Sequence, residues 1–304
     1  MMQNNGTTQL SIQIDNFLLD RKAANKSPKT IEFYSEKLDK FTKFCYSYNI
    51  YDPKQIDATH SRRFLIWLRD DEGHTPGGVH AYYRSVKVFV RWWALETDLT
   101  EYYRLFQRVK APKVDLELLQ PVSLFDVGAM LNICCDDWYG LRDQAMILVL
   151  LDTGVRAGEF LNFDISDIDF KNGSALVRKG KGSKDRTVFI GEVALQAVLD
   201  YLENRSSGPL WTIQVGSRLS YDGLRGVIAK CAAKAGIITP SLHSFRRAFA
   251  VNMLRNGVDL ETLRRLMGHK TILVTQRYLA LVNDDLKKAH DVASPVDTLK
   301  KLTD

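Results

Sequence analysis

The sequence predicts a mainly α-helical protein with a small β-sheet, divided into two domains. Its length of 304 residues exceeds the usual size of one domain, and 45% of the residues are hydrophobic, which is enough for a core in each half. Apolar residues recur at steps of three and four along much of the chain, as they do on the buried face of a helix. Two short strand-like runs joined by a glycine-rich turn predict a β-hairpin.

Two long helices are expected in the N-terminal half. Ser27-Pro28 provides a capping side chain and a proline suited to the first helical position, and the second long helix runs from near Thr75-Pro76 to about Leu95. A shorter helix spans roughly Ser61 to Leu68. The apolar faces comprise Ile31, Tyr34, Leu38, Phe41 and Cys45 in the first long helix, and Val79, Tyr83, Val86, Val90 and Trp93 in the second.

The second long helix carries another stripe, rotated roughly 100° from its apolar face. This cationic stripe comprises His80, Arg84, Lys87 and Arg91. A charged face exposed to solvent and a face that binds phosphates both account for the stripe, and the spacing alone favours the solvent.

A segment without helical periodicity separates the two halves. Val109 to Asp115 carries Pro112 between basic residues, which indicates an inter-domain linker. The expected organisation is a disordered N-terminus over 1–9, a helical domain over 10–108, the linker over 109–120, a second domain over 121–295 and a C-terminal tail over 296–304.

The second domain is predicted to be mainly helical around the hairpin. Its expected elements are a helix from Ser123 to Ile133, an apolar helix from Arg142 to Leu151 that ends near Gly154, and strands over Ser174–Lys179 and Arg186–Ile190. The turn between the strands, residues 180–185, is rich in glycine and lysine, so the hairpin has an exposed cationic tip.

Composition and charge restrict the class of protein only mildly. The formal net charge is +6 and the pI about 9.0, which suits a polyanionic partner but is also common in proteins without one. Four cysteines without Cys-x-x-Cys spacing favour a reduced cytoplasm. No apolar run approaches the length of a membrane span and the N-terminus is polar, so we expect neither secretion nor a membrane anchor.

Five residues form a pattern suited to phosphoryl transfer. Arg156 follows the helix break, His243 and Arg246 are three residues apart on one helix face, and Tyr278 lies nine residues after His269. Guanidinium groups hold phosphate oxygens bidentately, imidazoles bond to them or move protons, and a phenol attacks phosphorus to give a covalent ester.

Taken one at a time, these residues also have structural explanations. Arg156 can form a helical ion pair with Glu159, and a tyrosine among apolar neighbours is usually buried in a core. His269 follows Gly268 at an expected helix C-terminus, where the helix dipole favours an imidazolium and the glycine takes a left-handed turn. The order of the whole set therefore carries more weight than any member.

Cleavage of a phosphate ester also needs an acid, because the departing oxygen must gain a proton. Lys181 and Lys184 at the hairpin tip are both suitable. The sequence shows no His-Glu-x-x-His, no paired cysteines and no carboxylate trio, so we expect neither a metal nor another cofactor. The charge of a divalent ion would instead come from the side chains of Arg156, Lys181, His243, Arg246 and His269.

This set resembles the tyrosine recombinase (phage integrase) family, in which an Arg, a Lys, a His-x-x-Arg pair, a second His and a nucleophilic Tyr occur in this order. The resemblance covers nearly all of residues 10–290. It implies an N-terminal helical SAM-like core-binding domain and a mixed α/β catalytic domain, in a two-domain Xer-like layout. By the family's Gly-Lys-Gly motif it selects Lys181 as the acid, which leaves Lys184 and Arg186 as contacts to the DNA backbone.

The resemblance also implies an activity and its partners. Tyr278 would cleave double-stranded recombination sites through a 3′-phosphotyrosine and a Holliday junction, in a homotetramer whose protomers exchange C-terminal tails, and the cationic stripe would face DNA. Arg247 departs from the family, which often has histidine there. DNA relaxation like that of a type IB topoisomerase, or a catalytically silent DNA-binding regulator, remain the alternatives. The sequence leaves open integration, excision, transposon movement and dimer resolution.

Overall fold

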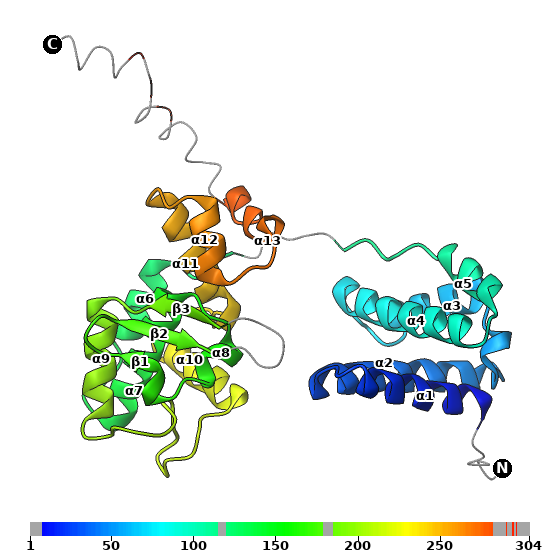
Figure 1. Ribbon diagram of the computed structural model, residues 1–304, viewed down its shortest axis with the longest axis horizontal. Helices are drawn as coiled ribbons and strands as arrows, with labels where there is room; N and C mark the ends of the chain where they lie inside the picture. Colours follow the sequence, from blue (N-terminus) through cyan, green and yellow to red (C-terminus); the bar gives the residue numbers. More distant parts are fainter. Residues whose placement is uncertain are drawn as a thin grey trace. The chain divides into compact units, whose positions relative to one another are not determined.

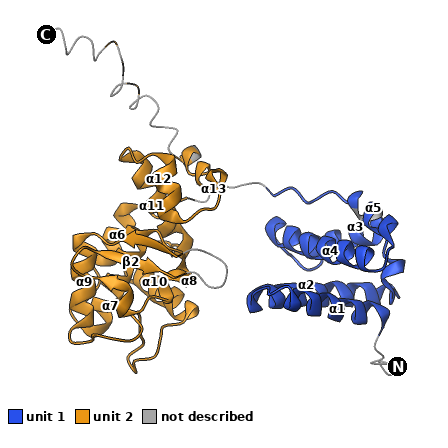
Figure 2. Ribbon diagram, in the orientation of Figure 1, with its two compact units in different colours: residues 1–117 blue, residues 118–304 orange. Residues whose placement is uncertain are grey.

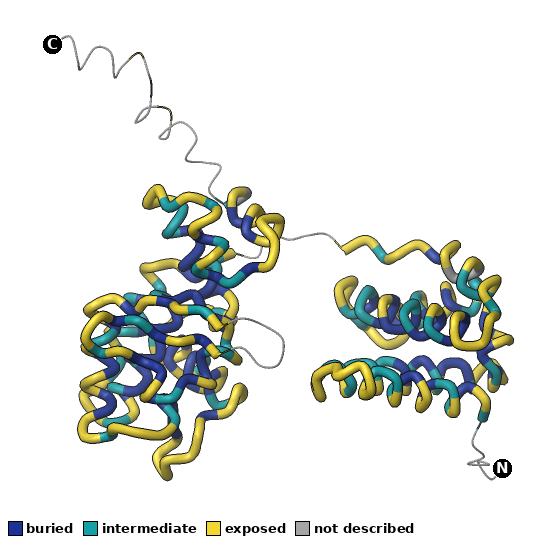
Figure 3. The backbone as a smooth tube through the Cα atoms, in the orientation of Figure 1, coloured by how far each residue is buried: buried dark blue, intermediate teal, exposed yellow. Residues whose placement is uncertain are grey.

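The computed structural model describes residues 8–114, 120–178 and 185–281, together with positions 290, 294 and 296. The chain forms two compact units, residues 1–117 and 118–304 (Figure 2). Each unit has its own hydrophobic core, and its buried residues lie on helix faces that turn toward one another (Figure 3). The described residues are mainly helical with one three-stranded sheet, which confirms the predicted fold class. No described helix is long and apolar enough to cross a membrane.

The N-terminal unit is a cluster of helices in which α4 is central, because α1, α2, α3 and α5 all pack against it (Figure 1). Ser27 and Thr75 cap α2 and α4 through their hydroxyl groups. Thr8 caps α1, whose first residue is Gln9, so the prediction of disorder is wrong for these two residues; positions 1–7 lie outside the described residues. The elements are α1 (Gln9–Ala23), α2 (Pro28–Ser47), η1 (Pro53–Gln55), α3 (Ala58–Asp70), α4 (Pro76–Glu96) and α5 (Thr100–Gln107).

The apolar faces predicted from spacing form the core of this unit. In α2, Leu38, Phe41 and Cys45 are buried, while Ile31 and Tyr34 near its start are half-buried. All five residues predicted for α4 are buried: Val79, Tyr83, Val86, Val90 and Trp93.

The segment 109–114 contains no helix or strand, yet it starts inside the N-terminal core. Val109 is only 2% exposed. The Tyr83 hydroxyl donates to the Val109 carbonyl at 3.1 Å, and Arg62 donates to the carbonyl of Arg108 at 3.2 Å. One apolar side chain and two hydrogen bonds therefore fix the start of the predicted linker on the helical unit.

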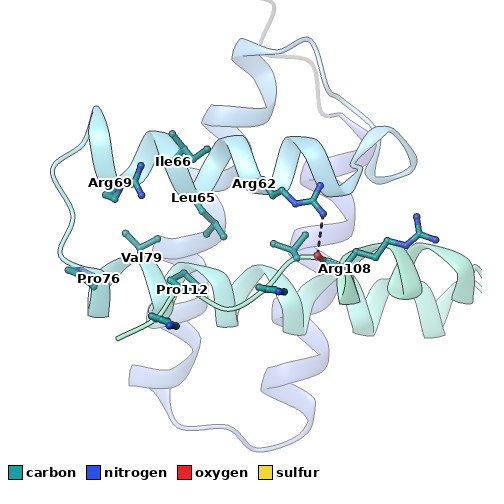
Figure 4. A pocket seen from close by; sticks show the side chains of 11 residues that line it. Arg62, Leu65, Ile66, Arg69, Pro76, Val79, Arg108 and Pro112 are labelled. Atoms are coloured by element: carbon teal, nitrogen blue, oxygen red, sulfur yellow. Dashed lines mark hydrogen bonds between the residues drawn. The ribbon is translucent and has the colours of Figure 1, made fainter. Parts of the chain in front are cut away.

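A pocket of about 680 Å³ lies where this segment passes α3 and the start of α4 (Figure 4). Its apolar part includes Leu65, Ile66 and Pro112. Positive charge thus continues from the helical unit into the first linker residues. The cations that line the pocket are Arg62, Arg69, Arg108, Lys110 and Lys113.

The C-terminal unit packs helices around a small antiparallel sheet of order β1-β2-β3 (Figure 1). The predicted hairpin is present, with Ser174 opposite Phe189 and Val177 opposite Arg186. The two-residue strand β1 was not predicted, because so short a run shows no periodicity. The elements are α6 (Leu124–Leu131), α7 (Trp138–Thr153), α8 (Ala157–Leu161), η2 (Ile165–Asp167), β1 (Ile168–Asp169), β2 (Ser174–Val177), β3 (Arg186–Phe189), α9 (Glu192–Leu202), α10 (Tyr221–Lys234), α11 (Leu242–Arg255), α12 (Leu260–Met267), α13 (Ile272–Gln276) and η3 (Leu279–Leu281).

Helix α7 crosses the middle of this unit and ends at a glycine that positions the site. Gly154 has a φ of 56°, in the left-handed region that favours glycine. A Cβ atom at this position would lie 2.3 Å from Cδ1 of Phe249 in α11. Glycine is therefore required both by the turn and by the close approach of α11, and Arg156 follows two residues later.

Candidate active site

The described candidate catalytic residues gather where α11, α12 and α13 pack together. Arg156 immediately precedes α8, His243 and Arg246 lie one turn apart in α11, His269 follows α12, and Tyr278 follows α13. Serine capping of α11 by Ser241 and the left-handed turn at Gly268, both expected from the sequence, are present.

Arg246 is the centre of the cluster. It is 2% exposed and donates from Nη1 to the Gly154 carbonyl at 2.5 Å and from Nη2 to the Met267 carbonyl at 2.8 Å. Burial, together with the charge of Arg156, lowers its pKa to about 10, so the guanidinium is still charged at neutral pH. No carboxylate among the described residues forms an ion pair with Arg246. A buried cation left without a counter-charge is a site for an anion.

His269 is bonded through both ring nitrogens and is 6% exposed. Its Nε2 lies 2.8 Å from Nη2 of Arg246, and its Nδ1 lies 2.9 Å from the Thr275 hydroxyl. Because arginine can only donate, Nε2 accepts, and Nδ1 carries the proton donated to Thr275.

The protonation state of His269 differs from the sequence prediction. Burial, followed by the charges of Arg246 and Arg156, lowers its pKa to about 4. The imidazolium expected from the helix dipole is therefore wrong, since desolvation and nearby guanidinium groups outweigh the dipole. At neutral pH the ring is a neutral hydrogen-bonding group.

Tyr278 packs beside His269. Their rings are nearly parallel, at 11°, with centroids 6.3 Å apart, and Tyr278 is 7% exposed. Burial lowers the pKa of both Arg246 and Arg247, whereas the phenol of Tyr278 acts in the opposite direction on each. Tyr278 therefore lies close to both arginines.

Arg156 is bound by Glu159 through one guanidinium nitrogen, and its side chain is partly exposed to solvent. Its Nη1 donates to Glu159 at 2.9 Å, its backbone N–H donates to the same carboxylate at 2.9 Å, and its side chain is 46% exposed. The predicted pairing of Arg156 with Glu159 is thus present. Burial of the Glu159 carboxyl acts against ionisation, but hydrogen bonds from Arg186 and Arg156 prevail and lower its pKa to about 2.

Arg186, which was predicted to contact the DNA backbone, is paired within the C-terminal unit. Its side chain is 9% exposed and donates to both oxygens of Glu159, at 3.0 and 2.8 Å. The structure thus gives Arg186 an ion pair with Glu159, and its contact with DNA stays a prediction. Lys181 and Lys184, on the predicted hairpin tip, lie outside the described residues.

His243 stands at the edge of the cluster, in the first turn of α11, and is exposed. Partial burial and the charges of Arg247, Arg246 and Arg156 all lower its pKa. A neutral imidazole therefore faces the arginines. Arg247 itself donates from Nε to the Gln120 carbonyl at 3.0 Å, which ties α11 to the start of the unit.

The cationic stripe of α4 is partly exposed. Arg84 and Arg91 are exposed, while His80 and Lys87 are half-buried. The Lys87 ammonium lies 5.7 Å from the centre of the Tyr83 ring, which explains its partial burial. Binding of this stripe to DNA stays a prediction.

Thr275 is the site residue that sequence reasoning missed. It is fully buried and fixes the His269 tautomer. A hydroxyl residue six positions after the histidine was the only available signal, and nothing in the local pattern distinguishes it from other threonines.

A helical N-terminal unit and a catalytic unit with a tyrosine beside clustered arginines and histidines define a DNA strand-transfer enzyme, and comparison with known proteins agrees. The model of the "Phage integrase family" matches residues 122–284, and "Phage integrase, N-terminal SAM-like domain" matches residues 14–101. The chain is 28% identical over 292 residues to tyrosine recombinase XerA of Pyrococcus furiosus, covering 94% of this chain and 95% of XerA. It is 28% identical over 277 residues to XerC of Escherichia coli O157:H7, covering 88% and 91%.

Solved structures show the same fold. XerH recombinase bound to a palindromic difH substrate, in a post-cleavage complex, matches with a TM-score of 0.71 and 20% identity, over 94% of this chain and 84% of XerH. The chain belongs to the phage integrase family. It is a tyrosine recombinase, an enzyme of site-specific DNA recombination.

Proposed function

We propose that the protein cleaves and rejoins double-stranded recombination sites through Tyr278. The phenolic oxygen bonds to the scissile phosphorus as the bond to the deoxyribose 5′ oxygen breaks, which leaves a 3′-phosphotyrosine and a 5′-hydroxyl. The 5′-hydroxyl of a partner strand then reverses the step and releases Tyr278. Two such rounds, through a Holliday junction, exchange both pairs of strands without a nucleotide cofactor.

The buried, unpaired charge of Arg246 is the observation that carries this proposal. Its guanidinium is held by two backbone carbonyls and His269 rather than by a carboxylate. Among the described residues, the Arg156 guanidinium bonds only to Glu159, through one nitrogen. Together they suit the two non-bridging oxygens of one phosphate, where charge gathers as phosphorus becomes pentavalent.

Proton transfers are assigned to groups at the edge of the cluster. The acceptor nitrogen of His269 is already bonded to Arg246, so His243, which is neutral and exposed, receives the phenolic proton. Resemblance to the family supports Lys181 as the donor to the 5′ oxygen, with Lys184 on the DNA backbone.

The N-terminal unit supplies DNA contacts in this proposal. The exposed arginines of α4, Arg84 and Arg91, together with His80 and Lys87, face the backbone phosphates. Four of the cations that line the linker pocket extend this surface: Arg62, Arg108, Lys110 and Lys113. Action on DNA implies a cytoplasmic enzyme associated with the nucleoid.

The active form is an assembly of several protomers on DNA. Family resemblance implies a homotetramer on two DNA sites in which each C-terminal tail docks on a neighbouring protomer. Except for positions 290, 294 and 296, the residues after 281 lie outside the described part of the chain.

A suicide substrate tests the central step. A DNA site nicked next to the cleavage position loses the 5′-hydroxyl that would reverse the reaction, so a covalent protein–DNA adduct accumulates on a denaturing gel. We expect the adduct with the wild-type protein and none with Tyr278→Phe, which should bind the same DNA with unchanged affinity. An equal amount of adduct with Tyr278→Phe would show that another residue is the nucleophile.

A further inference from the structure

Arg186, the first residue of β3, joins the two sides of the candidate active site. On one side it donates two hydrogen bonds to Glu159, the residue that holds Arg156. On the other side its Nε donates to the Leu266 carbonyl at 3.2 Å, in the last turn of α12, three residues before His269. A single guanidinium therefore links α8, β3 and the end of α12.

The packing around Arg186 leaves little freedom. A Cβ atom on Gly268 would lie 2.7 Å from Cδ and 2.8 Å from Nε of Arg186, so only glycine lets this side chain pass beneath the turn that carries His269. Gly268 also has a φ of 65°, which favours glycine independently.

Arg186 also limits the number of hydrogen bonds that Glu159 can accept from Arg156. A carboxylate has about four acceptor sites, and those of Glu159 receive Nη1 and the backbone N–H of Arg156 and both terminal nitrogens of Arg186. Because Arg186 takes half of them, Arg156 meets the carboxylate through a single guanidinium nitrogen. Its remaining donors stay available to an anion.

We propose that Arg186 is a positioning residue for strand cleavage. Arg186 neutralises part of the negative charge of Glu159, so Arg156 is held by one guanidinium nitrogen and keeps its other donors for the phosphate. Arg186 also fixes the turn that carries His269. This inference rests on the proposed phosphate-binding role of Arg156. Without Arg186, both Glu159 oxygens turn to Arg156 and compete with the phosphate for its guanidinium.

The first test separates positioning from a contact to DNA. Arg186→Gln should lower the single-turnover rate of adduct formation at saturating protein by about 10- to 100-fold, the usual cost of removing an outer partner of a site residue. DNA affinity and its salt dependence should not change. Weaker binding with a shallower salt slope, at an unchanged saturated rate, would mean that Arg186 contacts the DNA backbone and would overturn the proposal.

The second test is a rescue that a purely structural role does not predict. In the double variant Glu159→Gln/Arg186→Gln, the charge that captures Arg156 is gone, so cleavage should be faster than with Arg186→Gln alone. Arg186→Lys keeps the charge but not the three bonds, and should fall between the wild type and Arg186→Gln. If the double variant is as slow as Arg186→Gln or slower, Arg186 does not act through Glu159.

A matched arginine controls for lost stability. Arg218 also binds a carboxylate, Asp164, and two backbone carbonyls, those of Leu161 and Phe163. Arg218→Gln should lower the melting temperature without slowing saturated cleavage at a temperature where both variants are folded. An equal loss of rate in Arg218→Gln and Arg186→Gln would mean that lost stability explains the effect, and it would refute the positioning role of Arg186. If the wild-type protein forms no adduct, the proposed function fails and this inference fails with it, whereas equal saturated rates in the wild type and Arg186→Gln would refute the inference alone.

Discussion

The two units of this recombinase carry positive charge in opposite ways. In the C-terminal unit, Arg246 is 2% exposed and has both terminal nitrogens bonded before any substrate arrives. In the N-terminal unit, Arg84 and Arg91 are exposed on α4, and the Arg91 guanidinium lies 5.6 Å from the centre of the Tyr103 ring. The same residue type is buried and hydrogen-bonded in one unit and exposed in the other.

This difference assigns the two sets to different steps of the reaction. A buried and oriented guanidinium loses little entropy when charge develops on the phosphate, so it acts on the rate. An exposed arginine is screened by salt and releases counterions when it meets a phosphate, so it acts on affinity. Substitutions in the two units should therefore change different measured quantities.

Arg246→Lys should produce the largest effect and tests the buried side of the comparison. One ammonium group keeps the charge but cannot bond the Gly154 carbonyl, the Met267 carbonyl and a phosphate with the geometry of a fork. We expect the single-turnover cleavage rate at saturating protein to fall by about 10²- to 10³-fold, or about 2.7 to 4 kcal/mol in activation free energy.

Arg205 provides the control for Arg246. Its guanidinium also donates to two backbone carbonyls, those of Pro209 and Leu210, at 3.1 and 3.0 Å. Arg205→Lys should cleave at nearly the wild-type rate when saturated with DNA. If Arg246→Lys cleaves at the wild-type rate, Arg246 does not bind the scissile phosphate. The proposed distinction between the two units would then be wrong.

The sequence predicted the elements well where local chemistry determines them. Caps at Ser27, Ser123 and Ser241 and the left-handed turn at Gly268 lie where the motifs place them. Such features depend on neighbours a few residues apart, which a sequence displays directly.

The parts that escaped prediction depend on contacts between distant segments. Arg186 meets Glu159 27 positions away and Leu266 80 positions away, so its hairpin context suggested an exposed residue. The charge state of His269 likewise follows from burial against Arg246, whereas the helix end is the only feature visible in sequence. The protonation states and ion pairs in the site thus depend on the folded structure and cannot be predicted from a local motif.

The pH dependence of stability tests whether the buried cluster keeps His269 neutral. The folded pKa is depressed to about 4 from the ordinary value of 6.5. Between these two values His269 binds a proton in the unfolded chain but not in the folded protein. The free energy of unfolding therefore decreases as the pH falls from 6.5 toward 4. Denaturant unfolding between pH 7 and 4.5 should show this loss, and it should be smaller in His269→Gln.

Glu159 contributes little to the change in this pH window, because its pKa is depressed to about 2 and its stabilisation is lost mainly below its ordinary value of 4.5. His243 contributes in the same direction, so the comparison uses His243→Gln as a second background. Parallel stability curves for His269→Gln and the wild type would show that His269 is not held neutral by burial.

The smallest effect is expected on the exposed side, where Arg84→Ala should weaken DNA binding and leave saturated cleavage nearly unchanged. Each phosphate contact contributes about 0.9 to the slope of log K against log salt concentration, so the variant should lower that slope by roughly one. Binding isotherms at several salt concentrations measure the slope, and single-turnover cleavage at saturating protein measures the rate. Arg69, whose guanidinium is already paired with Asp70, is the matched exposed arginine, and Arg69→Ala should change the slope less. An unchanged slope for Arg84→Ala would assign the stripe to solvent, and the exposed half of the comparison would fail.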